Sequence, residues 1–571
     1  MHHLDEPSSN SSSDAAAVGP WYKELNRYHW FVLLVSVLGW LFDTMDQQLF
    51  NLARAPAIRE LMGPQYVQLY GAIATMVFMI GWATGGLVFG VLGDRIGRAK
   101  TMMWTILIYS FCTGLSSFSV GFWDFAFYRF LTGLGVGGEF AVGVALVAEV
   151  MPERARTHAL GWLQACSAIG NVTAAFISMG LAPFEAAGTL GAVQPWRVMF
   201  LIGALPALLA LVIRRRLKEP ERWQQLRDNP ESAKKLGSYS ELLSHPTWRK
   251  HALLGLVMAT AGVVGLWGIG FFSFDLVRSV FREQFNTEAR TPEATALDRG
   301  FVRQVIADPT RLETIGEGED QTKKTRIALA RDKVRVEHLL DEDSGLLYAA
   351  MLGLDKDQDI TPEVVLAAAT KSGARAEPLQ AVLHGVPPTT QPFPDAVRQI
   401  GERTQDIGSR LTLWAGINGL LFNIGAFFGI YAFARVTPFL GRKPTFAIAF
   451  VCALLTTAFA FWNLNKFGDI FWMVPLMGFF QISLFGGYAI YFPELFPTRL
   501  RSTGISFCYN VGRYAASVGP LILGALASQV FGVHGEVMSW RYAGVTMCSF
   551  FLLGLVVLPF LPETKDRPLP E

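Results

Sequence analysis

Two octapeptides of similar design, Glu149-Val-Met-Pro-Glu-Arg-Ala-Arg156 and Glu494-Leu-Phe-Pro-Thr-Arg-Leu-Arg501, each close an apolar stretch of the chain. Both have the spacing Glu-x-x-Pro-x-x-x-Arg, and the second begins 345 positions after the first. A further pair, Gly97-Arg98 and Gly441-Arg442, repeats with nearly the same offset. Matching signatures at matching places in two apolar halves indicate an internal repeat of membrane-embedded units.

The composition favours a membrane protein. Apolar residues make up 51% of the chain and charged residues 17%, whereas soluble domains carry about a quarter charged residues. The net charge of +2 lies in short loops, so we expect no nucleic-acid partner. The five cysteines all lie in apolar runs, which favours buried thiols over disulfides or metal ligands, and we predict no metal site. The Ser-rich N-terminus has no short apolar core with a cleavage site, which argues against a signal peptide.

Twelve runs of the length that crosses a bilayer as a helix, about 20 mostly apolar residues, can be counted. The first six are 29–50, 67–92, 101–119, 122–150, 158–181 and 197–213. The second six are 252–275, 409–434, 444–463, 470–492, 503–528 and 541–561. The predicted fold class is therefore an all-α membrane protein of twelve transmembrane helices, with both termini on one side.

Basic residues mark that side of the membrane. They fill the loops between spans two and three, four and five, six and seven, eight and nine, and ten and eleven, among them Arg95, Arg154, Arg215, Arg435 and Arg499. By the positive-inside rule, these loops and both termini are cytoplasmic. The external loops contain no evident N-glycosylation acceptor, which suits the cell (inner) membrane of a bacterium.

A charged stretch of the chain, residues 282–408, interrupts the second half between helices 7 and 8. The topology places it outside the cytoplasm, since long loops cross the membrane largely regardless of charge, and it is long enough for a small domain. The predicted organisation is a cytoplasmic tail (1–27), an N-terminal six-helix bundle (28–213), a cytoplasmic linker (214–250), helix 7 (251–281), an extracytoplasmic insertion (282–408), helices 8–12 of the C-terminal bundle (409–561) and a cytoplasmic tail (562–571).

These motifs resemble those of a known family. Gly90-x-x-x-Asp94-Arg95-x-Gly97-Arg98 resembles the loop signature of the major facilitator superfamily, and Arg129-x-x-x-Gly133-x-Gly135-x-Gly137-Gly138 resembles its fourth-helix signature. Trp196-Arg197, Glu219-Pro220-Glu221, Pro493-Glu494 and Pro562-Glu563-Thr564-Lys565 are similar to motifs of its sugar-porter-like and metabolite, aromatic-acid and sialate–proton symporter groups. The resemblance implies two six-helix bundles around a central site that opens alternately to each side, and no enzymatic activity. One departure is Pro438-Phe439, which stands where the first half has Asp94-Arg95, so the second half is expected to latch differently.

Ionisable residues inside apolar spans are costly and therefore candidates for function. Asp43 and Asp46 are three residues apart in the first span, so both carboxylates lie on nearly one helix face and are suited to taking and releasing a proton. The alternative is that the span ends earlier and both residues face water. Glu139 lies about 15 Å along the helix from Glu149. It is a second proton site, a partner for a cationic substrate group, or a buried acid paired with a neighbouring helix.

Arg513 lies near the middle of the eleventh span, where a guanidinium is suited to holding a carboxylate in a bidentate manner. The alternative is a structural ion pair with Glu139 or Asp46. The further substrate-binding candidates are Asn510, Trp267, Asn418 and Gln481, each of which could instead be an interhelical packing residue.

The resemblance also implies a cytoplasmic gate. Its predicted residues are Asp94, Arg95, Arg98, Arg129, Glu149, Arg156, Glu494 and Arg501, which are expected at cytoplasmic helix ends. Ion pairs among them would hold that side shut in the outward-facing state, and a purely structural role is the alternative.

The sequence predicts a monomeric secondary transporter that moves a small organic solute across the lipid bilayer, more readily an anion such as a carboxylate than a sugar, in symport with protons. No Gly-rich loop ending in Gly-Lys-Ser/Thr is present, so a proton gradient rather than ATP or a cofactor is the expected energy source. The alternatives are a sugar or polyol–proton symporter, and a transporter-like sensor that signals through the external insertion.

Overall fold

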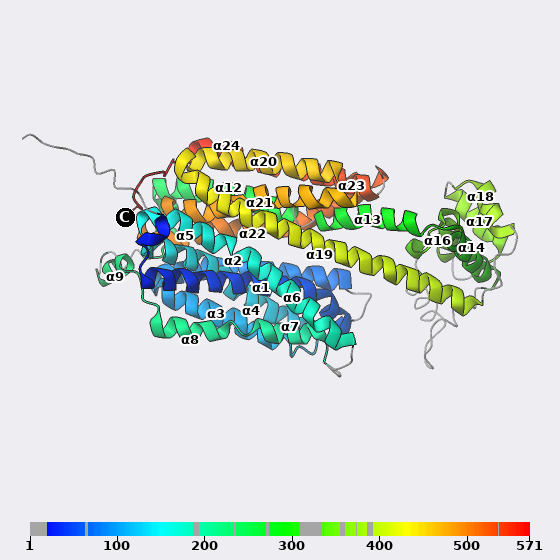
Figure 1. Cartoon of the computed structure of the whole chain (residues 1–571), viewed down its shortest axis with the longest axis horizontal. Helices are drawn as coiled ribbons and strands as arrows, with labels where there is room; N and C mark the ends of the chain where they lie inside the picture. The colour runs from blue at the N-terminus through cyan, green and yellow to red at the C-terminus, as the bar shows by residue number, and fades with distance from the viewer. Residues whose placement is uncertain are drawn as a thin grey trace, which may run out of the picture. The chain divides into compact units, whose positions relative to one another are not determined.

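The computed structural model describes residues 20–62, 67–186, 193–229, 231, 236–269, 273–308, 334, 336–354, 360–372, 374–384, 392–534 and 536–570, and all regular secondary structure within them is helical (Figure 1). The first helices are α1 (Arg27–Met62), α2 (Val67–Arg95), α3 (Arg98–Ser116), α4 (Phe122–Val150), α5 (Glu153–Ala165), α6 (Ser167–Ala186), α7 (Pro195–Gly203), α8 (Ala207–Arg216), α9 (Glu221–Asp228) and α11 (Tyr239–Ser244).

The later helices include several short ones and one of 48 residues. They are α12 (Pro246–Gly268), α13 (Ser273–Ala289), α14 (Pro292–Ala307), α16 (Glu342–Leu352), α17 (Pro362–Lys371), α18 (Ala376–His384), α19 (Phe393–Leu440), α20 (Arg442–Asn463), α21 (Phe467–Leu495), α22 (Arg501–Ala525), α23 (Glu536–Met547) and α24 (Phe550–Val557).

In the part of the chain that the structure describes, nine helical segments are long and apolar enough to cross a membrane. They are Arg27–Arg54, Ile73–Arg95, Phe122–Val150, Glu153–Leu181, Pro246–Leu266, Phe393–Leu440, Arg442–Asn463, Phe467–Leu495 and Val537–Phe560. Each coincides with a predicted span, and the three other predicted spans fall on α3, on α7 with α8, and on α22. The chain is therefore an all-α membrane protein, and the number of twelve spans stays a prediction.

The chain divides into two compact units. Unit 1 contains Met1–Phe272, Leu420–Asn463 and Phe471–Glu571, and unit 2 contains Ser273–Gly419 and Leu464–Ile470. The predicted limits of the insertion, 282 and 408, fall inside α13 and α19, so neither limit marks the end of an element.

Glycines bring α2 and α4 of unit 1 into backbone contact. A Cβ added to Gly81 would lie 2.2 Å from the carbonyl oxygen of Phe130, and one added to Gly85 would lie 1.9 Å from that of Leu134. No other residue type fits such an approach, because any side chain would collide with the facing helix backbone.

The second half of unit 1 repeats this contact between α19 and α21. A Cβ on Gly425 would lie 1.9 Å from the carbonyl oxygen of Pro475, and one on Gly429 would lie 1.9 Å from that of Phe479. Both glycines follow Gly81 and Gly85 by the offset that separates the charged signatures, to within one residue. The internal repeat read from the sequence is therefore a repeat of helix packing.

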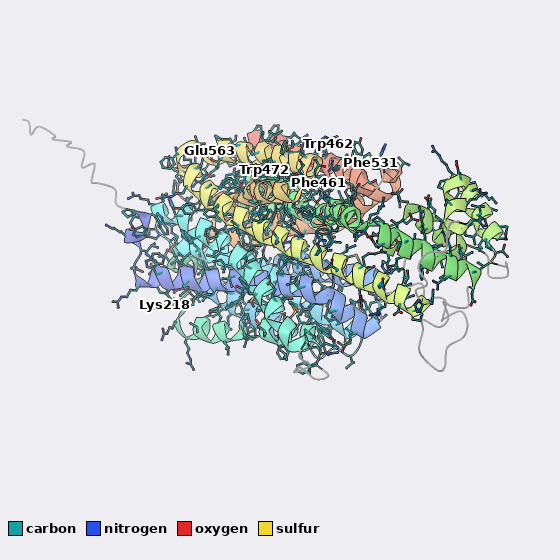
Figure 2. The ribbon with its side chains drawn as sticks, turned by 45° about the vertical axis from the view of Figure 1, so that its right-hand side comes forward. Lys218, Phe461, Trp462, Trp472, Phe531 and Glu563 are labelled. Atoms are coloured by element: carbon teal, nitrogen blue, oxygen red, sulfur yellow. The ribbon has the colours of Figure 1, made fainter. Side chains whose placement is uncertain are left out.

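Aromatic side chains gather at one end of the C-terminal helices of unit 1. Figure 2 shows Trp462 and Phe531 there, with Glu563 toward the opposite end of these helices. Trp472, in the second turn of α21, lies near Phe459 in a tilted arrangement with ring centroids 5.7 Å apart, and both tryptophans are about half exposed. Half-exposed tryptophans at helix ends are typical of the membrane–water interface.

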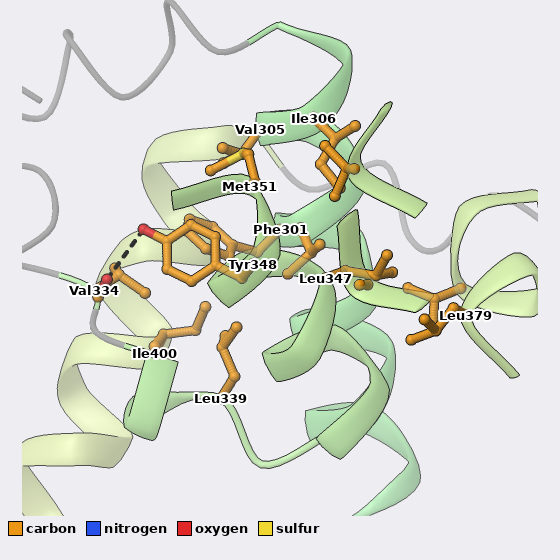
Figure 3. Packing of buried hydrophobic residues seen from close by; sticks show 14 of the residues in the cluster. Phe301, Val305, Ile306, Val334, Leu339, Leu347, Tyr348, Met351, Leu379 and Ile400 are labelled. Atoms are coloured by element: carbon orange, nitrogen blue, oxygen red, sulfur yellow. Dashed lines mark hydrogen bonds between the residues drawn. The ribbon is translucent and has the colours of Figure 1, made fainter. Parts of the chain in front are cut away.

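Unit 2 has a hydrophobic core of its own (Figure 3). Phe301 of α14 stacks on Phe393 at the start of α19 with ring centroids 5.7 Å apart, and Leu347 and Tyr348 of α16 are fully buried beside them. The hydroxyl of Tyr348 donates to the carbonyl oxygen of Val334 over 3.1 Å. The predicted small domain thus has the buried apolar cluster that independent folding requires.

We predict that Leu347→Ala weakens unit 2 by about 2–5 kcal/mol, because truncating a buried leucine leaves a cavity. Hydrogen exchange of the intact protein should show faster exchange of amides in α14 and α16, with the helices of unit 1 unaffected. The neighbouring Leu346 is 47% exposed, so Leu346→Ala is the matched control and should leave exchange unchanged. Equal exchange in the two variants would contradict this core.

Candidate functional site

The two aspartates of the first span lie in the interior of unit 1. Helix α1 continues to Met62, so Asp43 and Asp46 are in mid-helix rather than at its mouth. Both residues are fully buried by protein. The alternative in which the span ends before them is therefore wrong.

Asp46 has partners on α3 and α4. The hydroxyl of Thr113 donates to its Oδ1 over 2.6 Å, and Nη1 of Arg129 lies 3.8 Å from its Oδ2. Arg129 also donates to Ser116 and Thr132, and its guanidinium lies 4.5 Å from the ring centroid of Phe200. This carboxylate and guanidinium form a pair enclosed by protein.

This pair corrects the predicted position of Arg129. The fourth-helix signature led us to group Arg129 with the charged helix ends, but it lies in the second turn of α4. It is about 30 Å along the helix from Glu149. Counting turns from Phe122 would have placed it correctly.

Asp43 and Glu139 are less well satisfied. Neither carboxylate oxygen of Asp43 has a hydrogen-bond partner among the described residues, and Glu139 uses only Oε2, which accepts from Thr105 over 2.8 Å. A Cβ on Gly39, one turn before Asp43, would lie 2.3 Å from Oε1 of Glu139. The two carboxyl groups therefore belong to one region between α1 and α4, within electrostatic reach of each other and of Arg513.

Arg513 of α22 lies between two aromatic rings. Its guanidinium carbon is 4.0 Å from the ring centroid of Trp82 and 4.2 Å from that of Tyr509. Its Nη1 donates to Oδ1 of Asn510 over 2.6 Å, and Asn510 rests against Gly86 of α2. Arg513 forms no ion pair with any described carboxylate, so the structural pair with Glu139 or Asp46 that we considered is wrong.

The remaining predicted binding residues do not join this group as one set. Gln481 donates to Thr457 within the second half of unit 1. Asn418 belongs to unit 2, where its Nδ2 donates to Ser273 over 3.4 Å. Trp267 lies in α12, and its side chain is outside the described residues. The sequence analysis also missed Trp82, Phe140 and Tyr509. Single aromatic residues in apolar spans follow no motif, so nothing in the sequence marks these three as neighbours of the charged residues.

A second group of charges lies at one end of the helices and joins the two halves. Oε1 of Glu149 accepts from Nη2 of Arg98 over 2.9 Å and from Nη1 of Arg501 over 2.8 Å. Arg98 also pairs with Asp94 over 2.9 Å and donates to the carbonyl oxygen of Thr498. Asp94, Arg98, Glu149, Thr498 and Arg501 form what we call the charged-end cluster, and all four of its ionisable side chains are fully buried.

Asp94 also caps the first turn of α22 from the other half. Its carboxylate accepts from the backbone N–H of Ser502 over 3.2 Å and of Thr503 over 2.8 Å. The hydroxyl of Thr503 donates to it over 2.7 Å. A carboxylate at a helix N-terminus is favourable because it meets unpaired N–H groups and the positive end of the helix dipole.

The repeat-related pair in the second half is Arg442 and Glu494. It is bidentate, with Nε and Nη2 of Arg442 donating over 3.0 and 2.8 Å. Among the described residues, Arg442 reaches the first half through the hydroxyl of Thr157, at 3.3 Å. The contacts of the two pairs therefore differ, because Pro438 cannot supply the carboxylate that Asp94 supplies, and a different latch in the second half stays a prediction.

Two predicted gate residues stay outside these pairs. Arg95 is exposed, and its Nε donates to the carbonyl oxygen of Leu236 over 3.3 Å. Arg156 has electrostatic neighbours in Glu153 and Glu494, but its Nε has no hydrogen-bond partner among the described residues. Its repeat counterpart Arg501, by contrast, pairs with Glu149, which also pairs with Arg98.

The helices that follow the two Gly-Arg pairs are capped by glutamates from outside the spans. Glu219 accepts from the backbone N–H of Ala99 and Lys100 at the start of α3, each over 3.1 Å. Glu563 accepts from the N–H groups of Arg442 and Lys443 at the start of α20, over 2.9 and 3.0 Å. Capping of both helices by a distant glutamate is thus part of the repeat.

The electrostatics of these two caps differ. Burial raises the pKa of Glu219, and its backbone hydrogen bonds only partly oppose this. Burial would also raise the pKa of Glu563, but the backbone N–H groups of Arg442, Lys443, Lys565 and Thr564 outweigh it and lower that pKa. Both capped helices start after a glycine of positive φ, Gly97 at 114° and Gly441 at 97°.

The C-terminal segment lies against the charged end. The carbonyl oxygen of Pro570 accepts from Nη2 of Arg501 over 3.3 Å, and the hydroxyl of Thr564 donates to Glu494 over 2.6 Å. Leu569 is 5% exposed. This segment therefore contacts Arg501 of the charged-end cluster and Glu494 of the Arg442–Glu494 pair.

Comparisons with known proteins agree with this architecture. A model of the Major Facilitator Superfamily matches residues 36–292. The chain is 33% identical over 252 residues to a putative metabolite transport protein of Haemophilus influenzae, covering 43% of this chain and 58% of that protein. It is 34% identical over 206 residues to the sialic acid transporter NanX of Escherichia coli, covering 36% and 47%. The chain thus aligns with about half the length of these relatives.

Among solved structures, the proton:xylose symporter XylE bound to 6-bromo-6-deoxy-D-glucose matches 95% of this chain and 98% of its own. The TM-score is 0.54 at 15% sequence identity, so the likeness is one of fold. The sequence match to the Major Facilitator Superfamily thus covers residues 36–292, a little less than half of the chain, and the nine long apolar helical segments of the described residues agree with a multi-pass membrane protein.

We predict that Gly97→Ala lowers the thermal midpoint more than Gly441→Ala. Both positions have a φ that side chains avoid, at a cost of about 1–3 kcal/mol. At Gly97 the new Cβ would also lie 2.3 Å from Oε1 of Glu219, whereas at Gly441 it would lie 3.0 Å from Glu563. Thermal unfolding in detergent measures the difference. Gly401→Ala is the control, since nothing lies within 4 Å of its added Cβ, and equal midpoints for all three variants would contradict the cap geometry.

We predict that Glu149→Gln opens the charged end. The variant leaves two buried guanidiniums without their shared carboxylate, which costs about 3–5 kcal/mol in comparable pairs. The readout is the labelling rate of a cysteine at Ser506, which lies against Gly90 of α2 and is fully buried. Labelling should accelerate in Glu149→Gln but little in the control Glu494→Gln, where a single arginine is affected. Unchanged labelling would show that Glu149 does not hold this end closed.

Proposed function

We propose that this protein is a secondary transporter that moves a small organic solute, an organic anion such as a carboxylate, by alternating access and in symport with protons. The observation that supports this most directly is the group of buried charges in unit 1. Asp43, Asp46 and Glu139 are buried in the same unit as Arg129 and Arg513, and Asp46 faces Arg129 over 3.8 Å. Ionisable groups in such a position are retained at a cost, which favours a role in binding and translocation.

The charged-end cluster supports the alternating-access part of the proposal. Its contacts run between the halves, from Glu149 to Arg501, from Arg98 to Thr498 and from Asp94 to Thr503. Such a network biases an equilibrium between two arrangements of the halves, because its ion pairs exist in only one of them. On our assignment this end is cytoplasmic, and the state with these contacts is closed to the cytoplasm.

Proton coupling is best supported at Asp46. Its carboxylate faces Arg129 at 3.8 Å, a distance that leaves the pair weaker than a hydrogen-bonded one. Protonation of Asp46 would remove the charge that Arg129 faces while Thr113 could still hydrogen-bond the carboxyl group. A reversible change of this kind between α1 and α4 can couple proton binding to helix movement. Asp43 and Glu139 are the further proton-binding candidates.

Arg513 supports an anionic solute. A buried guanidinium without a carboxylate partner is an expensive arrangement, and a bound carboxylate would supply the missing charge. Trp82 and Tyr509 contact the guanidinium through their rings at 4.0 and 4.2 Å, which limits its movement without neutralising its charge. The relative that transports sialic acid, itself a carboxylate, is consistent with this choice.

The same proposal includes the topology. We infer twelve transmembrane helices in two six-helix bundles, both termini in the cytoplasm, an extracytoplasmic insertion within residues 282–408, and a monomer in the cell (inner) membrane. The charge distribution of the loops supports the orientation. The separate hydrophobic core of unit 2 supports an insertion that folds as a domain.

The test begins with a thermal-shift screen of the purified protein against carboxylates and sugars, since a ligand at 100 times its Kd stabilises the native form by about 2.7 kcal/mol. Uptake of the ligand that is found is then measured in proteoliposomes with an imposed pH gradient. We expect carboxylates to stabilise the protein and Arg513→Ala to abolish that shift. We expect Asp46→Asn to retain binding but to lose accumulation driven by the gradient.

Two outcomes would reject parts of the proposal. Stabilisation by sugars that Arg513→Ala leaves unchanged would favour a sugar or polyol symporter. Uptake that is insensitive to an uncoupler, or intact in Asp46→Asn, would reject proton coupling. Asp469→Asn is a control, because Asp469 lies at the start of α21, where it accepts only from backbone N–H groups.

A further inference from the structure

The central charges are divided into an ion pair and two acids without a basic partner. Asp46 and Arg129 face each other over 3.8 Å, and Thr113, Ser116 and Thr132 hydrogen-bond to them, although Oδ2 of Asp46 and Nη1 of Arg129 have no hydrogen bond among the described residues. Both oxygens of Asp43 and Oε1 of Glu139 have neither a hydrogen bond nor an ion pair among those residues. Buried polar atoms in native proteins are nearly always hydrogen-bonded, so each such atom needs an explanation.

These unsatisfied oxygens are enclosed by protein rather than exposed at a surface. Asp43 is fully buried and Glu139 is 1% exposed. Glu139 lies against Gly39, so both acids share one region between α1 and α4. A bound group that donates hydrogen bonds and carries positive charge would satisfy both acids together.

Aromatic rings pack beside Arg513 in the same part of unit 1. Phe140, which follows Glu139 in the chain, stacks on Tyr509 with ring centroids 4.3 Å apart, and Trp40 lies 4.8 Å from Phe140. Tyr509 in turn covers the guanidinium of Arg513. No ion pair joins Asp43 or Glu139 to Arg513 among the described residues, so these charges do not neutralise each other at contact distance.

Asn510 lies beside Arg513. Its Oδ1 is occupied by Arg513, while its Nδ2 has no partner among the described residues. An amide N–H₂ beside a guanidinium is a second donor for the same anion. Carboxylate-binding donors thus stand on α22, and carboxylate acceptors stand on α1 and α4.

A simple carboxylate would match only half of this arrangement. It would be bound by Arg513 and Asn510, but it would leave Asp43 and Glu139 unsatisfied and would add a negative charge near them. A simple cation would leave Arg513 unmatched in the same way. A solute with both charges, separated by a short spacer, would meet both groups of side chains at once.

We propose that the transported solute is dipolar, with a carboxylate held by Arg513 and Asn510 and an ammonium group held by Asp43 and Glu139. This inference rests on the proposed function and narrows its solute from an organic anion to an amino acid-like zwitterion. It assigns recognition to Asp43 and Glu139 and leaves proton coupling to the Asp46–Arg129 pair.

The test compares matched probes that differ only in the ammonium group. Suitable pairs are butyrate with 4-aminobutyrate, and benzoate with 3-(aminomethyl)benzoate, titrated into the full-length protein near neutral pH with tryptophan fluorescence or thermal shift as the readout. The dipolar member of a pair should bind about 10-fold or more tightly than the plain carboxylate, since a charge-assisted hydrogen bond contributes at least that factor.

Conservative variants identify the groups responsible. Glu139→Gln and Asp43→Asn should reduce the preference for the dipolar member to about a factor of one while the plain carboxylate still binds, because the lost charge serves only the ammonium group. Arg513→Gln should weaken both members. Glu60→Gln changes an acid of α1 that pairs with Arg197 away from this group, and it should keep the preference.

The outcomes separate this inference from the proposed function. If carboxylates bind through Arg513 but the two members of each pair bind equally, the inference is wrong and the organic-anion proposal stands. A preference that survives in both Glu139→Gln and Asp43→Asn would also overturn it. If sugars bind and no carboxylate does, both the organic-anion proposal and the zwitterion proposal are wrong.

Discussion

One oxygen of Glu149 joins the two halves of unit 1 at the charged end. It accepts from Arg98 of the first half and Arg501 of the second, over 2.9 and 2.8 Å, and all three side chains are fully buried. In a low-dielectric interior a guanidinium without a counter-charge is far more costly than a hydrogen bond is favourable. If the two halves separate, water or another anion must replace Glu149 at one of the two arginines. The ion pair between Glu149 and Arg501 is therefore expected to be either fully present or fully absent.

The repeat is reproduced in packing but not in charge. Helix contacts at Gly85 and Gly429, and glutamate caps at the two Gly-Arg pairs, recur in both halves. The carboxylate of Asp94 has no counterpart, because Pro438 stands in its place, and among the described residues Arg442 reaches the other half through Thr157. The charged end is thus held mainly by the acids of the first half, which leaves the second half's arginine–glutamate pair to stabilise its own helices.

The sequence was sufficient for the all-α membrane fold, since apolar runs of fixed length have one stable solution in lipid. It also located the charged-end pairs, because recurring signatures mark residues that meet after folding. It failed where partners come from different helices without a repeated motif. Its motif placed Arg129 among the predicted gate residues, although its turn in α4 faces Asp46. For Arg513 the sequence analysis considered an ion pair with an acid, and the described residues contain no such pair. Aromatic neighbours such as Trp82 carry no spacing that would reveal them.

The two groups of charges are satisfied to different degrees. At the charged end, the carboxylates of Asp94 and Glu149 meet guanidiniums or helix N–H groups, as expected of a contact that stabilises one conformation. In the centre, both oxygens of Asp43 have neither a hydrogen bond nor an ion pair among the described residues, and Glu139 and Asn510 each keep one buried atom without a partner, although Asn510 accepts from Arg513. Natural proteins tolerate such local inconsistency mainly at functional sites. The missing partners are therefore best sought in the molecule that the protein carries, because only a transient occupant must leave its site unsatisfied on departure.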